Sequence, residues 1–263
     1  MPDSEPWWGD FPLTEQQSLC WSIGERQLII QRQASEWSTW NIETETENQE
    51  RLVRTDHANQ ELPDQVLLGR HLQATTAASL RVIPALADRS IVTRPNVPLR
   101  LLGGEKTRIY VSTPLWFKAL TLPGDLCLLD VPFWRPSDSW FGPSTREGEM
   151  CYAKYTEARL QVALLEQRPH RAITPVFIHN KQREALLIDR LNVPVPLLSL
   201  YQDTHQGLWT NTISVTREAD DDLIELLLEK QAPAEAQDAS LVAAPRIASG
   251  RHTLIRSLGS LFA

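Results

Sequence analysis

Short runs of β-forming residues, separated at close intervals by turn residues, constrain this chain more than any other feature of its sequence. Between residues 65 and 215, runs rich in Val, Ile, Leu and Tyr alternate with Pro, Gly, Asn and Asp. No helical segments alternate with these runs, as a parallel α/β sheet would require. The spacing therefore predicts an all-β, β-sandwich-like fold. The runs expected to be strands are 79–85, 90–93, 107–112, 126–131, 151–155, 174–179, 185–189, 197–201 and 208–215.

Three segments outside those runs carry weaker signals. Residues 20–30 are typical of two strands joined by a turn near Gly24. Residues 43–47 alternate Glu with Thr, which favours a charged edge strand that discourages further pairing. Residues 157–167 are compatible with a helix.

One internal similarity suggests two related β units in tandem. Residues 94–102 can be aligned with residues 190–198, which places Pro98 opposite Pro194. Proline cannot donate to a β ladder, so it marks the start, edge or exit of a strand. Two explanations fit: a duplication, or chance similarity within β-rich sequence. The duplication predicts that residues 79–112 and 172–215 form equivalent strand sets with the two prolines at matching positions.

The sequence changes character after residue 218. Acidic residues followed by Leu223, Leu226 and Leu227 predict a helix, and an Ala-, Pro- and Glu-rich stretch predicts a mobile linker. The expected organisation is an N-terminal β region with an acidic loop at 1–64, a first β-sandwich unit at 65–125, a second at 126–218, a helix at 219–231, the linker at 232–245 and an amphipathic tail at 246–263.

The tail is expected to form a helix with one apolar side. A segment this short is marginal alone, so it should become ordered only when something covers that side. The candidates are the protein's own β core, a groove on a partner or an anionic membrane surface. Partner docking is our functional hypothesis. The docking residues would be Leu254, Ile255, Leu258, Leu261 and Phe262.

Composition limits the classes of function. The net charge of −7 argues against general nucleic-acid binding. The most apolar stretch, 115–134, is interrupted by charged residues, so no membrane span is expected. The acidic, polar start differs from a secretory signal, which favours a cytoplasmic location. The three cysteines are far apart and are predicted to be small buried hydrophobic residues without disulfides: Cys20, Cys127 and Cys151.

No catalytic or metal-binding motif is recognisable. The six histidines form neither H-x-H nor H-E-x-x-H and lie beside no cysteine pair, so no metal or other cofactor is expected. The Gly-Gly-Glu-Lys-Thr sequence at 103–107 has Glu105 where a phosphate loop needs glycine. No G-x-S-x-G nucleophile elbow occurs.

The densest cluster of aromatic and charged residues lies at 130–152, between two β runs. Loops on rigid scaffolds often bind ligands or partners, and aromatic faces beside carboxylates and Arg suit a sugar or a peptide. Two converging carboxylates could also serve acid–base hydrolysis. The structural alternative is a crossover whose tryptophans fill the core. The candidate binding residues are Trp134, Asp138, Trp140, Arg146 and Glu149.

Three sequence blocks carry a family resemblance. They are Ser-Thr-Pro-Leu-Trp at 112–116, Ser-Trp-Phe-Gly at 139–142 and Glu-Gly-Glu-Met-Cys-Tyr-Ala at 147–153. Their order and spacing resemble domain of unknown function 432, an uncharacterised archaeal and bacterial family, over about residues 60–218. The resemblance implies no activity and assigns no residue a role. It implies a membrane-protein partner, because genes of this family are frequent neighbours of small mechanosensitive channels.

These observations favour a non-enzymatic β-sandwich protein-interaction module, associated with a membrane protein such as a mechanosensitive channel. The alternative is a carbohydrate- or small-ligand-binding protein, or a hydrolase, that uses the 130–152 loop. The surroundings of Trp140 should discriminate between them. An open cleft with converging carboxylates would favour the ligand hypothesis, and a filled core would favour the interaction hypothesis.

Overall fold

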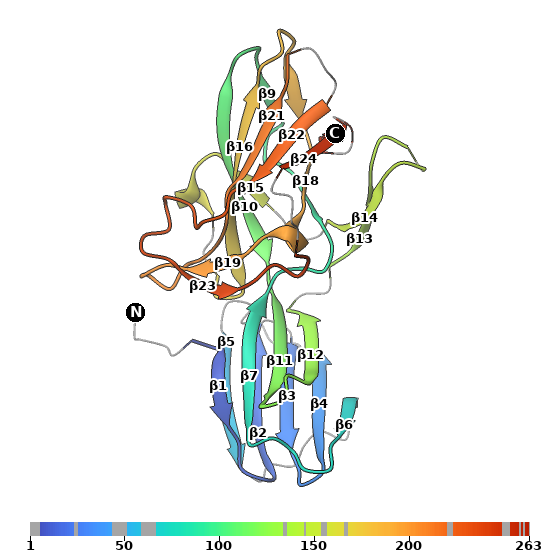
Figure 1. Cartoon of the computed structure of the whole chain (residues 1–263), viewed down its shortest axis with the longest axis vertical. Helices are drawn as coiled ribbons and strands as arrows, with labels where there is room; N and C mark the ends of the chain where they lie inside the picture. The colour runs from blue at the N-terminus through green and yellow to red at the C-terminus, as the bar shows by residue number, and fades with distance from the viewer. Residues whose placement is uncertain are drawn as a thin grey trace. The chain divides into compact units, whose positions relative to one another are not determined.

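The chain folds almost entirely into β-strands, with two short 3-10 helices among its described residues (Figure 1). The computed structural model describes residues 6–23, 26–43, 52–58, 67–133, 136–144, 146–153, 157–165, 168–219, 223–248, 253–257, 259 and 261–262, with residues 52–58, 67–68, 157 and 253–257 described by their backbone alone. Among these residues, no helix is long and apolar enough to cross a membrane.

Contacts divide the chain into two compact units. Unit 1 comprises Met1–Ala85 and Trp116–Trp134, and unit 2 comprises Leu86–Leu115 and Arg135–Ala263. Both units are therefore discontinuous in sequence. The segments 65–125 and 126–218, which the sequence suggested as successive units, each contribute to both.

Unit 1 is a sandwich of two antiparallel sheets (Figure 1). The first sheet contains, in spatial order, β1 (Gly9–Pro12), β7 (Ser79–Ala85), β11 (Trp116–Leu122) and β12 (Cys127–Pro132). The second contains β5 (Leu52–Ala58), β2 (Gln17–Ile23), β3 (Arg26–Arg32), β4 (Glu36–Glu43) and β6 (Leu67–Leu72).

Aromatic side chains fill the space between these two sheets. Trp21 of β2 and Phe117 of β11 are fully buried, and their ring centroids lie 4.8 Å apart. The ring of Phe117 also stacks on Trp7 at 5.9 Å. The indole nitrogen of Trp21 donates to the Trp7 carbonyl at 3.0 Å, so this polar atom is satisfied inside the core. Buried tryptophan side chains are thus a main component of the core of unit 1.

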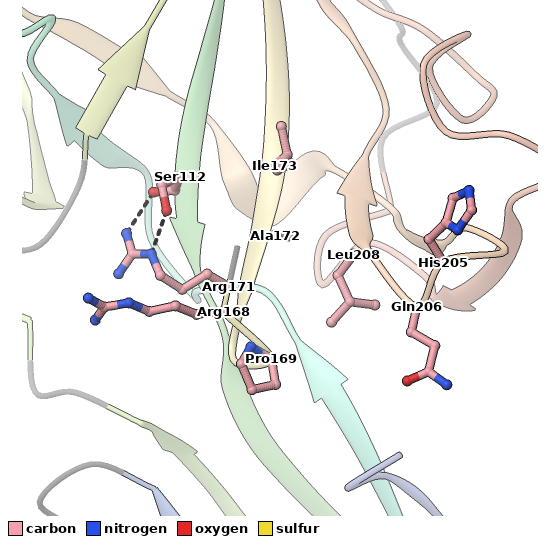
Figure 2. A pocket seen from close by; sticks show the side chains of 10 residues that line it. Ser112, Arg168, Pro169, Arg171, Ala172, Ile173, His205, Gln206 and Leu208 are labelled. Atoms are coloured by element: carbon pink, nitrogen blue, oxygen red, sulfur yellow. Dashed lines mark hydrogen bonds between the residues drawn. The ribbon is translucent and has the colours of Figure 1, made fainter. Parts of the chain in front are cut away.

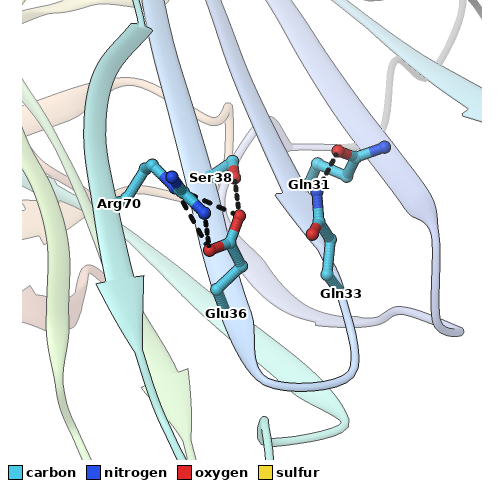
Figure 3. Close-up of polar contacts among 5 residues, drawn as sticks. All are labelled: Gln31, Gln33, Glu36, Ser38 and Arg70. Carbon is cyan, nitrogen blue, oxygen red and sulfur yellow. Dashed lines mark hydrogen bonds and ion pairs between the residues drawn. The ribbon is translucent and has the colours of Figure 1, made fainter.

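A charged contact joins the edge strand β6 to β4 (Figure 3). The Nε atom of Arg70 donates to the Glu36 carboxylate at 3.1 Å, and the Ser38 hydroxyl donates to the same group at 3.2 Å. The hydrogen bond from Arg70 is the main reason that the pKa of Glu36 lies below its ordinary value. The Glu36 carboxylate is therefore ionised at neutral pH, although the residue is largely buried.

The largest sheet of unit 2 is built around the long strand β16. In spatial order its main path is β23 (Ser240–Ala243), β19 (Leu200–Gln202), β20 (Leu208–Thr210), β16 (Arg171–Asn180), β21 (Ile213–Arg217), β22 (Leu223–Leu228) and β24 (Thr253–Ser257). β10 (Lys106–Pro114) pairs with β16 and with β15 (Glu157–Arg159). β16 runs parallel to β20 and β21, so the sheet is mixed.

Two smaller sheets and two 3-10 helices complete the described part of unit 2. One sheet has the order β13 (Asp138–Phe141), β14 (Glu149–Tyr152), β8 (Ile91–Thr93) and β18 (Leu191–Val193). The other pairs β17 (Leu186–Ile188) with β9 (Leu99–Leu101). The 3-10 helices are η1 (Val162–Leu164) and η2 (Val195–Leu197). Every run predicted as a strand from 79–85 to 208–215 overlaps an observed strand, which confirms the all-β expectation.

The helix predicted over 219–231 is wrong. Residues 223–228 form β22, in which Ile224, Leu226 and Leu228 are buried and the intervening side chains are exposed. The leucines that suggested helical spacing also fit a period of two, because Leu-rich sequence satisfies both patterns. Pairing with β21 on one side and β24 on the other decides in favour of the strand.

The predicted helical tail is a strand followed by buried residues. Leu254 and Ile255 belong to β24, whose backbone pairs antiparallel with β22. Leu261 and Phe262 are buried, and the amide of Asn192 donates to the Leu261 carbonyl at 3.0 Å. The side chains of Leu261 and Phe262 are therefore packed within the chain's own fold. Leu258 lies outside the described residues.

The segment predicted to be a mobile linker, 232–245, is packed within unit 2. It contains β23, and Ala236 is buried against Leu165, Ile173 and Trp209. Glu235 accepts a hydrogen bond from the Tyr110 hydroxyl at 2.9 Å and contacts Arg108. Burial alone would raise the pKa of Glu235, but a backbone hydrogen bond, Tyr110 and Arg108 together hold it below its ordinary value.

The proposed duplication does not match the observed elements. Pro98 is exposed and precedes β9, whereas Pro194 is buried, follows β18 and is the N-cap of η2. The strands that the alignment would equate at the start, β7 and β16, belong to different units. The similarity between residues 94–102 and 190–198 is therefore explained by chance in β-rich sequence.

Three smaller expectations can also be compared with the fold. Cys20 and Cys151 are buried as predicted, but Cys127 is exposed because it begins β12 at the edge of its sheet. Residues 157–167, which were compatible with a helix, contain β15 and η1. Of the edge strand expected at 43–47, only Glu43 is among the described residues, and it is the last residue of β4.

Candidate functional site

The aromatic and acidic segment singled out from the sequence folds into the β13–β14 hairpin. Asp138 pairs with Tyr152, and Trp140 pairs with Met150. Because successive side chains point to opposite faces of a strand, these four residues share one face of the hairpin. In Figure 1 the hairpin lies beside the nine-stranded sheet and is not part of it. We call the face formed by Asp138, Trp140, Met150 and Tyr152 the hairpin face.

The opposite side of the hairpin anchors it to unit 2. Phe141 and Cys151 are buried there in a cluster with Val92 of β8. The guanidinium of Arg190 lies 5.5 Å from the centroid of the Phe141 ring. The Nδ2 atom of Asn192, in β18, donates to the Glu149 carboxylate. Aromatic packing and hydrogen bonding thus fix this side, so the hairpin face is presented on a supported element.

The turn of the hairpin holds the Trp140 ring in place. The indole nitrogen of Trp140 donates to the Ser144 carbonyl at 2.9 Å, and the Ser144 hydroxyl accepts from the Glu147 amide at 3.1 Å. A Cβ atom at Gly148 would lie 2.8 Å from the indole ring, so glycine is required for this close approach. The ring is therefore held in one orientation by the turn.

Two large apolar side chains are exposed next to each other on the hairpin face. Trp140 is 43% exposed and Met150 is 47% exposed, and they lie directly opposite each other in the ladder. Among the tryptophans in the described part of the chain, Trp140 alone is exposed. Paired strand residues are close enough for their side chains to touch, so the two form one apolar surface.

A polar network borders this apolar pair. Arg89 Nη1 lies 3.1 Å from Asp138 Oδ1, and the Arg89 guanidinium lies 5.3 Å from the centroid of the Tyr152 ring. The Tyr152 hydroxyl donates to Asp88 at 2.9 Å. Burial, followed by this hydrogen bond, raises the pKa of Tyr152, so the hydroxyl keeps its proton at neutral pH. The network combines Arg and Tyr with carboxylates beside the exposed Trp140.

The structure separates the residues that the sequence placed together. Asp138 and Trp140 do share the hairpin face, and Arg146 is exposed in the turn. Glu149 lies on the opposite face, where it accepts from Asn192, so its carboxylate does not converge with that of Asp138. Trp134 lies outside the described residues.

Sequence reasoning missed four residues of this site. Met150 and Tyr152 would have been found if the segment had been treated as a hairpin, because the ladder places them opposite Trp140 and Asp138. Arg89 and Asp88 come from the segment between β7 and β8, and no signal in the sequence connects them to the hairpin.

Two cavities lie away from the hairpin. One, of about 200 Å³ in unit 2, is lined by both polar and apolar residues (Figure 2). Arg168 and Arg171 run side by side in Figure 2, with His205 and Gln206 across the opening, and Arg171 donates to the Ser112 carbonyl at 2.8 Å. The other cavity, of about 460 Å³ in unit 1, is lined by residues 15–16, 31 and 33–35. No hairpin residue lines either one, and the described side chains contain no cluster of three or more metal-ligand residues.

Comparisons with known proteins identify one family. The model of the family described as "Protein of unknown function (DUF432)" matches residues 7–262. This match extends in both directions beyond the region of about 60–218 in which the sequence blocks occur. No curated protein and no solved structure matches the chain significantly.

Proposed function

We propose that this chain, which belongs to the DUF432 family of proteins of unknown function, is a protein-interaction module that binds a partner through its hairpin face. The observation that carries this proposal is the exposed Trp140–Met150 pair. Single exposed apolar residues are ordinary on protein surfaces. Two large apolar side chains that lie opposite each other on a supported hairpin form a surface that a partner could bury.

The composition of the hairpin face supports protein binding. Trp, Tyr and Arg are the residue types that contribute most binding energy at protein interfaces. Trp140 and Tyr152 belong to the hairpin face, and Arg89 packs on the Tyr152 ring beside it. Met suits a contact that must adapt to its partner's shape. The Trp140–Ser144 hydrogen bond restricts the indole before binding, which lowers the entropy cost of association.

The geometry gives less support to the ligand or hydrolase alternative. A glycosidase mechanism requires two carboxylates that flank one bond, and Asp138 and Glu149 point to opposite sides of the hairpin. Sugar-binding sites are usually concave, and the two cavities described above do not involve the hairpin. Trp140 therefore lies neither in a filled core nor beside converging carboxylates, the two surroundings that were expected to discriminate between the hypotheses. Its exposure next to Met150 is what supports the interaction hypothesis.

The partner to test first is the cytoplasmic domain of a membrane protein, such as a small mechanosensitive channel. The family resemblance supports this choice, and the proposal includes a cytoplasmic location for the protein. The hairpin face is the proposed contact surface whichever protein is the partner.

Affinity purification of the intact chain from its own cells tests the proposal. The double variant Trp140→Ala, Met150→Ala should fail to recover a protein that the unmodified chain recovers. Leu187→Ala, which removes another exposed apolar side chain from unit 2, is the matched control and should recover that protein normally. Equal recovery with the double variant and the control would show that the hairpin face is not the binding surface.

A further inference from the structure

Within the described part of the chain, the backbone of β13 has an open edge. β13 is the terminal strand of its sheet, and among the described strands only β14 pairs with it. The Ala153 amide donates to the Ser137 carbonyl at 3.2 Å, which makes residues 137 and 153 a hydrogen-bonded pair. Such pairs alternate along an antiparallel ladder. The backbone N–H and C=O groups of Ser139 and Phe141 therefore form hydrogen bonds with β14. The backbone N–H and C=O groups of Asp138 and Trp140 point away from β14.

A second hydrogen bond confirms this register. The Tyr152 amide donates to the Ser90 carbonyl at 2.9 Å, on the side of β14 that faces β8. Tyr152 is the ladder partner of Asp138, and its amide points toward β8. Asp138 and Tyr152 therefore exchange no backbone hydrogen bonds with each other. The open edge of β13 thus offers the N–H and C=O groups of two residues, one of which carries the exposed indole.

Proteins usually protect such an edge with proline, a charge or a covering segment. β13 contains no proline. Its one charged residue, Asp138, is paired with Arg89 through Oδ1. The exposed side chain of Trp140 lies on this edge strand, where an approaching strand could cover it, and Met150 lies one strand further in, on β14.

We propose that β13 accepts an extended segment of the protein partner as an additional β-strand. This inference rests on the proposed function and specifies how the hairpin face is used. Main-chain hydrogen bonds would hold the segment, and its alternate side chains would provide specificity. An apolar residue of the segment would contact Trp140, which lies beside Met150 on the hairpin face.

The charges near the edge favour a basic segment. The exposed carboxylates of Asp88, Asp138 and Glu147 outnumber the guanidinium groups of Arg89 and Arg146. The side chain of Asp138 is 65% exposed, and Arg89 occupies only one of its oxygens. A Lys or Arg of the incoming segment could therefore pair with the other oxygen of Asp138.

The test uses the full chain and the acetylated, amidated peptide Lys-Val-Thr-Val-Thr-Val-Lys as the probe. Asp138→Pro removes the outward N–H at a strand's first position, where proline is tolerated. Asp138→Ala removes the same carboxylate but keeps the N–H, so it is the matched control. Equal melting temperatures of the two variants would establish that the hairpin is retained in both.

Strand addition predicts that the peptide binds the unmodified chain and protects the amides of Asp138 and Trp140 from hydrogen exchange. The Asp138→Pro variant should bind roughly tenfold more weakly than the Asp138→Ala variant. Failure of the peptide to bind at about 1 mM would overturn strand addition. So would equal affinities of the two Asp138 variants.

The two proposals can fail separately. If Trp140→Ala, Met150→Ala abolishes partner recovery while Asp138→Pro recovers the partner as well as Asp138→Ala does, the hairpin face binds the partner but the edge does not. If the double variant recovers the partner normally, the proposed function itself fails.

Discussion

Phe262 provides a direct test of whether the C-terminal residues belong to the core. Its side chain is 4% exposed, and it forms an isolated bridge with Leu191 of β18. Replacing a buried Phe with Ala typically costs about 3–5 kcal/mol, because transfer free energy is lost and a cavity remains. Phe262→Ala should therefore destabilise unit 2 by about that amount.

Urea unfolding of the full chain measures this effect. With a slope of about 3 kcal/mol per M, the expected loss lowers the midpoint by about 1 M or more. Leu241→Ala is the control, since Leu241 lies in β23 of the same unit but is 61% exposed. Its substitution should change the free energy of unfolding by less than about 0.5 kcal/mol.

A small effect of Phe262→Ala would refute the reasoning. If its midpoint matched that of Leu241→Ala, the C-terminal residues would contribute little to the fold in solution. The interpretation of the tail as part of unit 2 would then be wrong. Docking of the tail on a partner would again be the hypothesis to test.

Three further predictions follow from exposure and charge. Trp140→Ala should cost only about 2 kcal/mol, less than a buried Trp would, because nearly half of the side chain is exposed; thermal melting checks this. The pKa of Glu235 is lowered in the folded state, so its contribution to stability is full above its ordinary pKa and is lost as the pH falls through the folded value. Glu235→Gln should therefore reduce the fall in urea midpoint between neutral pH and about pH 3. Cys127 should react with a thiol reagent in the native protein, whereas Cys20 should react only after unfolding.

The sequence predicted strands well because turn residues mark where they end. It failed at β22, where Leu223, Leu226 and Leu227 fit both helical and strand spacing. Only the pairing of β22 with β21 and β24 resolves that ambiguity, and pairing between distant segments leaves no local signal. The C-terminal residues were misassigned for the same reason.

The candidate site was predictable in part. Asp138 and Trp140 stood out by residue type, and they do share the hairpin face. The strand register determines that Glu149 faces the other way, because a change of one residue moves a side chain to the opposite side. Arg89 reaches Asp138 from another segment of unit 2, and that contact depends on tertiary structure.

The discontinuous path of the chain has a consequence for dissecting it. Ala85 and Trp116 are ladder partners at the adjoining ends of β7 and β11, so residues 86–115 are inserted at what would otherwise be a hairpin turn. Expressing residues 1–134 would leave that insertion without the rest of unit 2. Replacing it with a two-residue turn such as Asn-Gly would reconnect β7 to β11 directly. The resulting chain would make unit 1 a contiguous gene product that can be produced and studied alone.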